Sequence, residues 1–297
     1  MNPTLSICVV NYNAGDVVVE CLESIYKNVT IPDLEVILVD NASSDQSNLT
    51  IKKKFPQTIL IQNSENAGFI RANNQGLKRS RGRYVLSLNP DTIVPPGSLE
   101  KLTHFLETHP DYGAVGGKLH SPNNDFQWQC RRSFPTPFVA CAYFLRLRKF
   151  FPEVELFHRY TLTNYSPDQS LDVEAISGAC FMVPREVLEQ TNGMDESFFM
   201  YGDDLDWSYR IHEKGWKIRY CADAPIMHYG GLGGAQHGSY RLISHYYNAM
   251  WIFYDHHLRR SRSLPTTLLV WIGIKAMTGL HKLLFALGIR RSVSRKK

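Results

Sequence analysis

The sequence predicts an α/β protein built on a mostly parallel, doubly wound sheet. Three observations support this fold class: short apolar runs recur through the first half of the chain, segments of helical periodicity separate them, and the spacing fits strand–helix–strand units. The chain has 297 residues, of which 43% are hydrophobic and 21% charged. This length and composition are typical of a folded protein with one large buried core, or a core with a small appendage.

Four apolar, β-branched runs in the first half are predicted strands, at residues 5–10, 34–39, 58–61 and 84–88. Helical periodicity predicts helices over 17–28, 68–79 and 98–108. The loop at 41–45 contains Ser and Asp side chains that can cap a following helix. In a parallel sheet ligands bind beyond the carboxyl ends of the strands, so polar residues at those ends are the first candidates for a binding site.

The second half is less regular between residues 121 and 172 and becomes regular again at Val173. Residues 176–183 form a predicted strand and 184–190 a short helix. A further helix is predicted over 206–214, ended by Gly215, and a strand over 217–221.

Basic residues gather beside apolar ones, which suits a membrane interface better than a DNA groove. The clusters are Arg146, Arg148 and Lys149; Arg259, Arg260 and Arg262; and Arg290, Arg291, Arg295, Lys296 and Lys297. The apolar tail at 264–289 is long enough to span a bilayer, but Lys275 and Lys282 interrupt it. We therefore expect an amphipathic helix that lies in the interface, with spanning as the alternative.

The six cysteines form no CxxC pair, which argues against a zinc site. The chain begins without a charged-then-apolar leader. Both observations favour a reducing, cytosolic location without disulfides.

Asp40 and Asp91 each follow a predicted strand, where ligand-binding carboxylates belong. Asp91 closes the turn Asn89-Pro90-Asp91, and a carboxylate in a stiff turn suits a hard divalent cation. Asn and Asp are also ordinary turn residues, so a purely structural role stays open.

A second constellation is Tyr201-Gly202-Asp203-Asp204-Leu205-Asp206-Trp207. Carboxylates this close repel one another unless a cation or a proton intervenes. A helix N-terminus would also favour acidic residues, and both interpretations remain open here.

Three weaker signals accompany these carboxylates. His228 follows the apolar residues 225–227 and is either a core histidine or an imidazole ligand that completes a Mg²⁺ or Mn²⁺ site. Gly68, after Asn66, opens a predicted helix and would let a ligand approach the backbone closely. The glycine-rich run at 230–234 is either a loop that closes over a diphosphate, with Arg241 near by in sequence, or a plain flexible link.

Taken in order, these segments resemble the family 2 inverting glycosyltransferases, whose fold is called GT-A. The resemblance covers about residues 4–231. The segments that carry it are 9–13, 39–45, 66–69, 89–91, 177–179, 201–206 and 228–230. It implies a GT-A catalytic domain over residues 1–231 and a helical, membrane-associating extension over 232–297.

The resemblance also implies roles for individual residues. A nucleotide-sugar donor would be bound by Asn11, Asp40, Asn66, Gly68, Asn89 and Asp91. Within that set Asp40 would read the pyrimidine base. Asp91 and His228 would hold Mg²⁺ or Mn²⁺, although Asn89 replaces the first acid of the family's Asp-x-Asp motif. Asp204 would be the catalytic base, and Asp203 would bind an acceptor or sugar hydroxyl.

Within the family the sequence is most similar to bacterial rhamnosyltransferases, on the basis of residues 176–183 and 199–207. The resemblance implies dTDP-L-rhamnose as donor, polyprenyl-diphosphate-linked N-acetylglucosamine as acceptor, and a role in cell-surface polysaccharide synthesis. It further implies a peripheral or monotopic location at the cytoplasmic face of the bacterial inner membrane, with no nucleic-acid partner.

Other functions remain as alternatives: a family 2 transferase with another nucleotide sugar, a hydrolase, pyrophosphorylase or nucleotidyltransferase on a related fold, or a non-catalytic binding protein. The pyrophosphorylase alternative is disfavoured because residues 11–16 contain one glycine and no basic residue.

Overall fold

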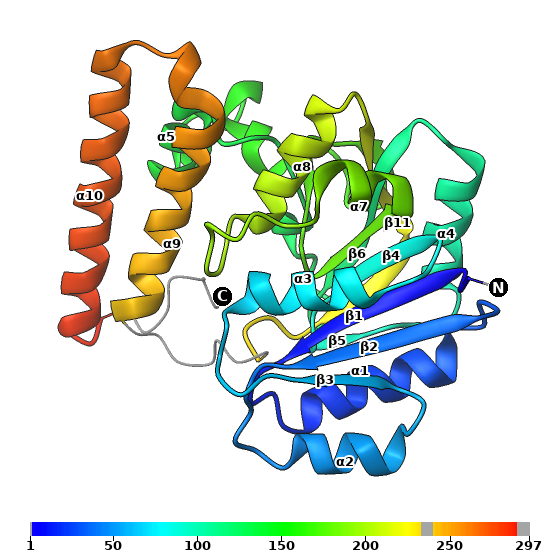
Figure 1. Cartoon of the computed structure of the whole chain (residues 1–297). Coiled ribbons are helices and arrows are strands. Elements are labelled where there is room, and N and C mark those ends of the chain that lie inside the picture. The colour runs from blue at the N-terminus through cyan, green and yellow to red at the C-terminus, as the bar shows by residue number, and fades with distance from the viewer. Residues whose placement is uncertain (1, 233–239, 290–297) are drawn as a thin grey trace.

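The computed structural model describes residues 2–232 and 240–289, and a nine-stranded sheet forms its centre (Figure 1). The strand order is β3-β2-β1-β4-β10-β6-β11-β5, with β8 paired to β11. Six strands point the same way: β1 (Leu5–Asn11), β2 (Leu34–Asp40), β3 (Ile59–Gln62), β4 (Tyr84–Leu88), β6 (Tyr112–His120) and β11 (Lys217–His228). The predicted mostly parallel α/β sheet is confirmed.

Three shorter strands run in the opposite direction. They are β5 (Thr92–Ile93), β8 (Leu171–Asp172) and β10 (Cys180–Pro184). β10 is antiparallel to both of its neighbours, β4 and β6, and joins the first half of the sheet to the second. The sheet is therefore continuous across the two halves of the chain.

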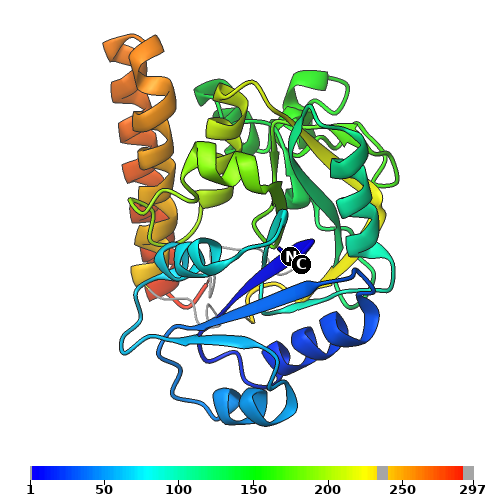
Figure 2. The same ribbon diagram turned by 45° about the vertical axis from the view of Figure 1, so that its right-hand side comes forward.

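Helices cover both faces of the sheet (Figures 1 and 2). On one face lie α1 (Asp16–Asn28), α2 (Ser47–Lys54) and α4 (Ser98–Thr108), and on the other lie α3 (Phe69–Arg79), α7 (Arg185–Thr191) and α8 (Asp203–Glu213). Every residue of β1 is buried, as expected of a strand covered on both faces. The sheet and these helices bury one continuous apolar core.

The predicted strand at 176–183 is wrong as a single element. β9 (Ala175–Ile176) pairs with β7 (Arg131–Arg132) in a separate two-stranded sheet, and β10 begins only at Cys180. Between them a turn is closed by the backbone N–H of Cys180, which donates to Ser177 O at 3.2 Å. The turn directs the N–H of Gly178 toward the acidic motif, so the interruption serves the site described below.

Two other boundaries differ from the sequence prediction. Helix α8 begins at Asp203 rather than at 206, because Gly202 takes a left-handed conformation with φ of 76° and starts the helix there. The last strand, β11, runs on to His228 instead of ending at 221, and thus places that histidine at the sheet edge.

The C-terminal extension is a helical hairpin beside the sheet domain. α9 (Tyr240–Phe253) continues through a π-helical turn (Tyr254–Leu258), and α10 (Leu264–Ala286) packs on its outer side (Figure 1). α9 contacts the sheet domain through Phe199, which stacks on His245 with ring centroids 4.5 Å apart, and through Ala249, which lies against Gly202. The predicted helical extension is therefore present where residues are described. Outside them lie the whole basic cluster from Arg290 to Lys297 and two residues of the glycine-rich run, Gly233 and Gly234.

α10 exposes most of its apolar side chains. Leu264, Leu268, Leu269 and Leu283 are 81%, 57%, 69% and 56% exposed, and His281 is the one buried residue in the helix. In the part of the chain that the structure describes, α10 is the one helix long and apolar enough to cross a membrane. A second exposed apolar surface lies on α5 (Pro137–Phe144) and α6 (Leu147–Phe150).

Candidate active site

The carboxyl ends of β1 and β2 bring Asn11 and Asp40 together. The two residues are paired in register, and Asn11 Nδ2 donates to Asp40 Oδ1 at 3.1 Å. Asp40 Oδ2 accepts the backbone N–H of Ser43 at 3.3 Å. The side chains of Asn11 and Asp40 are both buried. A carboxylate has about four acceptor positions, so Asp40 keeps capacity for a ligand donor at the sheet edge.

Asn66 and Gly68 adjoin this edge through an amide network centred on Asn41. Asn41 Nδ2 donates to Asn66 Oδ1 at 2.8 Å, and Asn66 Oδ1 also accepts the N–H of Gly68 at 2.9 Å. Gly68 has φ of 88°, and a Cβ there would lie 3.0 Å from the ring of Phe199. Phe199 therefore occupies the side of Gly68 on which a Cβ would lie, and the ligand contact expected at the Gly68 backbone stays a prediction.

The second part of the site joins the β4–β5 turn to the end of β11. His228 Nε2 lies 3.2 Å from Asp91 Oδ1 and 3.3 Å from Asn89 Nδ2. Asp91 Oδ2 accepts the N–H of Leu232 at 3.0 Å. Burial raises the pKa of Asp91, but the hydrogen bonds from His228 and Leu232 outweigh it and hold that pKa below the usual range.

The tautomer of His228 follows from its contacts with Gln127. Gln127 Nε2 donates to the backbone oxygen of His228 at 2.7 Å, which turns Gln127 Oε1 toward the ring Nδ1 at 2.8 Å. An amide oxygen only accepts, so Nδ1 carries a proton. Nε2 faces Asp91, to which it donates when it carries a proton of its own, and in the neutral ring it presents a lone pair to a metal. Nε2 and Asp91 Oδ1 are thus two adjacent ligand atoms that fit a divalent cation whose remaining ligands are phosphate or water oxygens.

The acidic motif forms the first turn of α8. Asp204 Oδ2 accepts the N–H of Gly178 at 3.0 Å and the guanidinium of Arg132 at 2.5 Å. Its neighbour Asp203 is buried, and burial together with the charge of Asp204 raises the pKa of Asp203 to about 7. The two carboxyl groups therefore differ: Asp204 is paired with a cation, and Asp203 exchanges a proton near neutral pH.

Arg132 is held rigidly in this arrangement. Its side chain is 10% exposed, and it also donates to the backbone oxygen of Ile176 at 3.2 Å. Burial lowers the pKa of Arg132, but Asp204 and Tyr160 outweigh that effect and raise it. Arg132 is consequently a permanent cation beside the acidic motif.

The two parts of the site are linked through the turn before β10. The backbone N–H of Asn89 donates to Ala179 O at 3.1 Å, and the adjacent Gly178 donates to Asp204. A side chain at Gly178 would lie 3.5 Å from the carboxylate of Asp203. The Asp91–His228 pair and the acidic motif are thus fixed relative to each other by one short turn.

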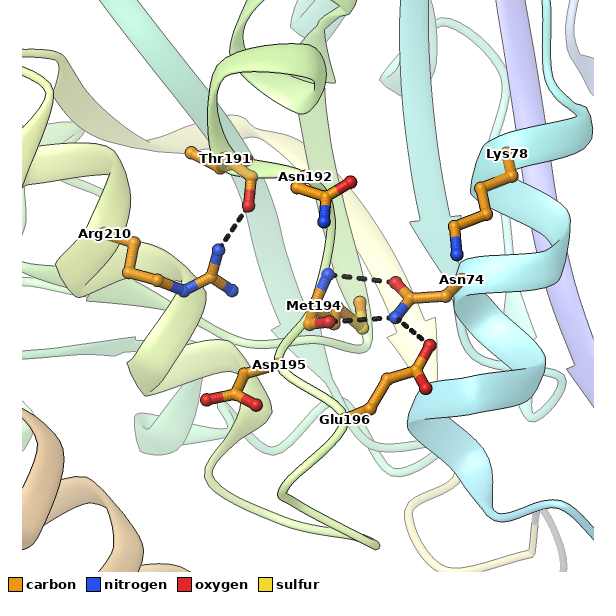
Figure 3. A pocket seen from close by; sticks show the side chains of 8 residues that line it. All are labelled: Asn74, Lys78, Thr191, Asn192, Met194, Asp195, Glu196 and Arg210. Atoms are coloured by element: carbon orange, nitrogen blue, oxygen red, sulfur yellow. Dashed lines mark hydrogen bonds between the residues drawn. The ribbon is translucent and has the colours of Figure 1, made fainter.

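The loop that precedes the acidic motif is braced by its own polar contacts (Figure 3). Asn74 bonds to both backbone atoms of Met194 at 2.9 Å, and Arg210 donates to Thr191 O at 2.6 Å. These groups line a cavity of about 300 Å³ and mostly bond to one another. We interpret the cavity as part of the scaffold that orients α8.

Two site residues were missed by the sequence analysis. Arg132 lies in the irregular region 121–172, and its pairing with Asp204 joins residues 72 positions apart. Gln127 lies in the same region, 101 positions from His228. Neither residue belongs to a local motif, so the chain carried no nearby signal for either contact.

Solved glycosyltransferases of the GT-A class share the fold of this chain. The mannosyltransferase PcManGT from Pyrobaculum calidifontis, in complex with GDP-Man and Mn²⁺, superposes with a TM-score of 0.58 and 19% identity over 95% of this chain and 70% of that chain. GalNAc-T7 with UDP, GalNAc and Mn²⁺ gives a TM-score of 0.58 and 17% identity over 76% of this chain and 43% of that one.

The chain belongs to glycosyl transferase family 2, whose model matches residues 6–191. It is 25% identical to the N-acetylglucosaminyl-diphospho-decaprenol L-rhamnosyltransferase of Mycobacterium tuberculosis over 86% of each chain. It is 26% identical to the O-antigen biosynthesis protein RfbC of Myxococcus xanthus over 76% of this chain and 17% of that protein. The predicted family and fold are confirmed.

Proposed function

We propose that this protein is an inverting, metal-dependent rhamnosyltransferase that transfers L-rhamnose from dTDP-L-rhamnose to a polyprenyl-diphosphate-linked N-acetylglucosamine. The observation that carries the proposal is that the turn at 177–179 links two chemically different centres. One centre is the carboxylate–imidazole pair of Asp91 and His228, and the other is the acidic motif that contains Asp203 and Asp204. A nucleotide-sugar transfer requires both kinds of centre, one for the diphosphate and one for the acceptor hydroxyl.

The donor half of the reaction is assigned to the sheet edge. Asp40, with Asn11 beside it, accepts from the imide of the base, and Asn89 donates to the sugar or ribose. Asp91 and His228 would hold Mg²⁺ or Mn²⁺, which neutralises the charge that develops on the leaving diphosphate. Of the two solved structures above, one contains Mn²⁺ with GDP-Man and the other contains Mn²⁺ with UDP and GalNAc, which supports this choice of metal.

The acceptor half is assigned to the acidic motif. Asp204 removes the proton from the acceptor hydroxyl, because its carboxylate is positioned by Arg132 and is more exposed than that of Asp203. Asp203, whose pKa of about 7 leaves it partly protonated, donates a hydrogen bond to an acceptor or sugar oxygen. Attack from the side opposite the leaving diphosphate inverts the configuration at the anomeric carbon.

The choice of donor and acceptor rests on the relative from Mycobacterium tuberculosis, which matches this chain along most of its length. Its name specifies an L-rhamnosyl group and an N-acetylglucosaminyl-diphospho-decaprenol. A lipid-linked acceptor requires an enzyme at the membrane surface, and two exposed apolar surfaces beside basic residues support that location. We place the protein at the cytoplasmic face of the bacterial inner membrane.

The packing of α10 favours a helix that lies on the membrane. Near its start, Thr267 bonds to Tyr254 at 2.9 Å, and near its end His281 bonds to Tyr247 at 2.7 Å. Both partners belong to α9 and its π-helical continuation, which pack on the sheet domain. A helix fastened at both ends to a globular domain presents its free face to lipid without leaving that domain.

The test is a transfer assay with a synthetic polyprenyl-diphosphate-linked N-acetylglucosamine, a panel of nucleotide sugars, and Mg²⁺, Mn²⁺ or EDTA. Product from dTDP-L-rhamnose alone, lost with EDTA, supports the proposal. Product from a different nucleotide sugar keeps the enzyme class and discards rhamnose. An absence of transfer from every donor, with tight dTDP binding, would favour the non-catalytic alternative.

A further inference from the structure

A cavity of about 510 Å³ lies where the hairpin turns between the π-helical segment and α10. Its lining is mostly basic and includes one leucine. The residues that line it are Asp255, His256, Arg259, Arg260, Arg262, Leu264 and Thr267. We propose that this cavity binds the phosphate group of an anionic membrane phospholipid and fixes how the enzyme sits on the bilayer; the inference rests on the membrane location proposed above.

The charge in the cavity is unbalanced. Arg259 is neutralised by Asp255, to which it donates at 2.6 Å. Among residues 2–232 and 240–289, neither Arg260 nor Arg262 forms an ion pair, and both side chains are exposed. Two free guanidinium groups beside one neutralised pair leave a net positive cavity, which attracts an anion. Guanidinium groups bind phosphate through paired parallel hydrogen bonds, so phosphate is the anion they fit best.

The position of the cavity selects a lipid phosphate over a soluble one. Leu264, 81% exposed, lines the cavity and begins the apolar face of α10. Leu268 and Leu269 continue that exposed face one turn further along the helix. A phospholipid presents a phosphate next to its acyl chains, and this cavity has arginines next to Leu264, where the exposed apolar helix begins. Because the phosphate and acyl chains of a phospholipid would meet arginine and leucine side chains respectively, a phospholipid fits this cavity better than a soluble phosphate.

The cavity is also connected to the acidic motif. His256, in its lining, lies 3.3 Å from Asp195, and the next residue, His257, bonds to Asp206 at 2.7 Å. Asp206 belongs to α8, two residues after Asp204. A phosphate held by Arg260 and Arg262 would therefore set the orientation of α8 relative to the membrane. A lipid-linked acceptor has to reach the acidic motif at the start of α8 from that membrane.

The experiment measures co-sedimentation of the full chain with vesicles of phosphatidylcholine alone and of phosphatidylcholine with phosphatidylglycerol. The test variant is Arg260→Gln/Arg262→Gln, and the control is Lys52→Gln/Lys53→Gln, which removes two charges from α2 at the opposite end of the molecule (Figure 1). We expect the test variant to bind anionic vesicles about 30-fold more weakly, since each lost charge weakens binding about fivefold. The control should bind them like the unmodified chain.

Two outcomes would overturn the proposal. The first is unchanged binding of the test variant to anionic vesicles. The second is a loss confined to phosphatidylcholine vesicles that contain polyprenyl-diphosphate N-acetylglucosamine, which would assign the arginines to the acceptor diphosphate. Calorimetry of dTDP with Mn²⁺ is done on the same variants. Loss of vesicle binding with normal dTDP binding supports the lipid site. Vesicle binding as expected, with no dTDP binding by any chain, would sink the proposed function and leave the lipid site standing.

Discussion

The guanidinium of Arg132 lies 2.5 Å from the carboxylate of Asp204, and both side chains are largely buried, at 10% and 16% exposed. Three acidic residues begin α8: Arg132 offsets the repulsion between Asp203 and Asp204, and Asp206 is paired with Arg210. The pairing with Arg132 also fixes Asp204 against the turn at Gly178. Arg132 is thus a positioning residue for the proposed base.

Replacement of Arg132 by Gln should lower both stability and turnover. Removing one partner of a buried ion pair costs about 3 to 5 kcal/mol, because the remaining charge loses its compensation. Arg132→Lys, which keeps the charge, should recover part of both losses. The matched control is Arg159→Gln, since the Arg159–Glu174 pair is 54% and 39% exposed and such pairs contribute less than about 1 kcal/mol. Equal denaturant midpoints for Arg132→Gln and Arg159→Gln would contradict the assignment.

Asp203 should make stability depend on pH. Its pKa is raised from 3.8 to about 7 by burial and by the charge of Asp204, so the folded chain binds a proton there more tightly than the unfolded chain. The stability contributed by that proton is complete below about pH 4 and is lost as the pH rises to about 7. Asp203→Asn should remove this decline, which urea titrations across the pH range will show. Parallel curves for the two proteins would mean that Asp203 is ionised throughout.

Gln127 should tune metal binding through His228. Its amide holds the ring so that Nδ1 carries the proton and Nε2 faces Asp91. Loss of such an outer partner typically weakens metal binding about 10- to 100-fold. Gln127→Leu should therefore bind Mn²⁺ with dTDP more weakly by that factor, while Gln127→Glu, which still accepts from Nδ1, should lose less. Calorimetry that finds the Leu variant equal to the unmodified chain would remove Gln127 from this role.

Gly68 should be intolerant of a side chain for two separate reasons. Its φ of 88° is a strained conformation for any other residue, and a Cβ would lie 3.0 Å from Phe199. Gly97 is left-handed, with φ of 79° and ψ of −6°, and has nothing within 4 Å of a Cβ, so Gly97→Ala measures the cost of a left-handed backbone without a contact. Gly68, with ψ of 158°, instead lies in a region that glycine alone adopts readily. We expect Gly97→Ala to lower the free energy of unfolding by about 1 kcal/mol. Gly68→Ala should lower it by more, because the backbone conformation alone costs about 1 to 3 kcal/mol and the contact with the Phe199 ring adds to that. Equal unfolding free energies would show that Phe199 simply moves aside.

Much of the fold was predictable because β1, β2 and β4 are continuous apolar runs whose polar ends mark the site. β6 was missed because it contains Gly113, Gly116 and Gly117, and glycine is rare in strands. The structure supplies the reason for them: a Cβ at Gly113 would lie 2.5 Å from Trp216, and one at Gly117 would lie 2.4 Å from a backbone oxygen. Close packing, which no local pattern records, hides this strand.

The candidate site shows the same division. The carboxylates and His228 were found because each follows a strand or starts a helix, and the fold alone brings such ends to one edge. Arg132 and Gln127 were not found, because their partners are contributed by distant segments. The turn at 177–179 was taken for strand, since its flanks are apolar and its hydrogen bonds to Asn89 and Asp204 exist only in the folded chain.

The most direct test of the proposed chemistry is the rate of sugar transfer by Asp204→Asn, measured beside its affinity for dTDP and Mn²⁺. Loss of a general base typically lowers turnover by about 10² to 10⁴. We predict a decrease of that size with dTDP affinity close to that of the unmodified chain, because Asp204 lies at the acceptor side of the site. Near-normal turnover by Asp204→Asn would show that another group accepts the proton and would contradict the mechanism proposed here.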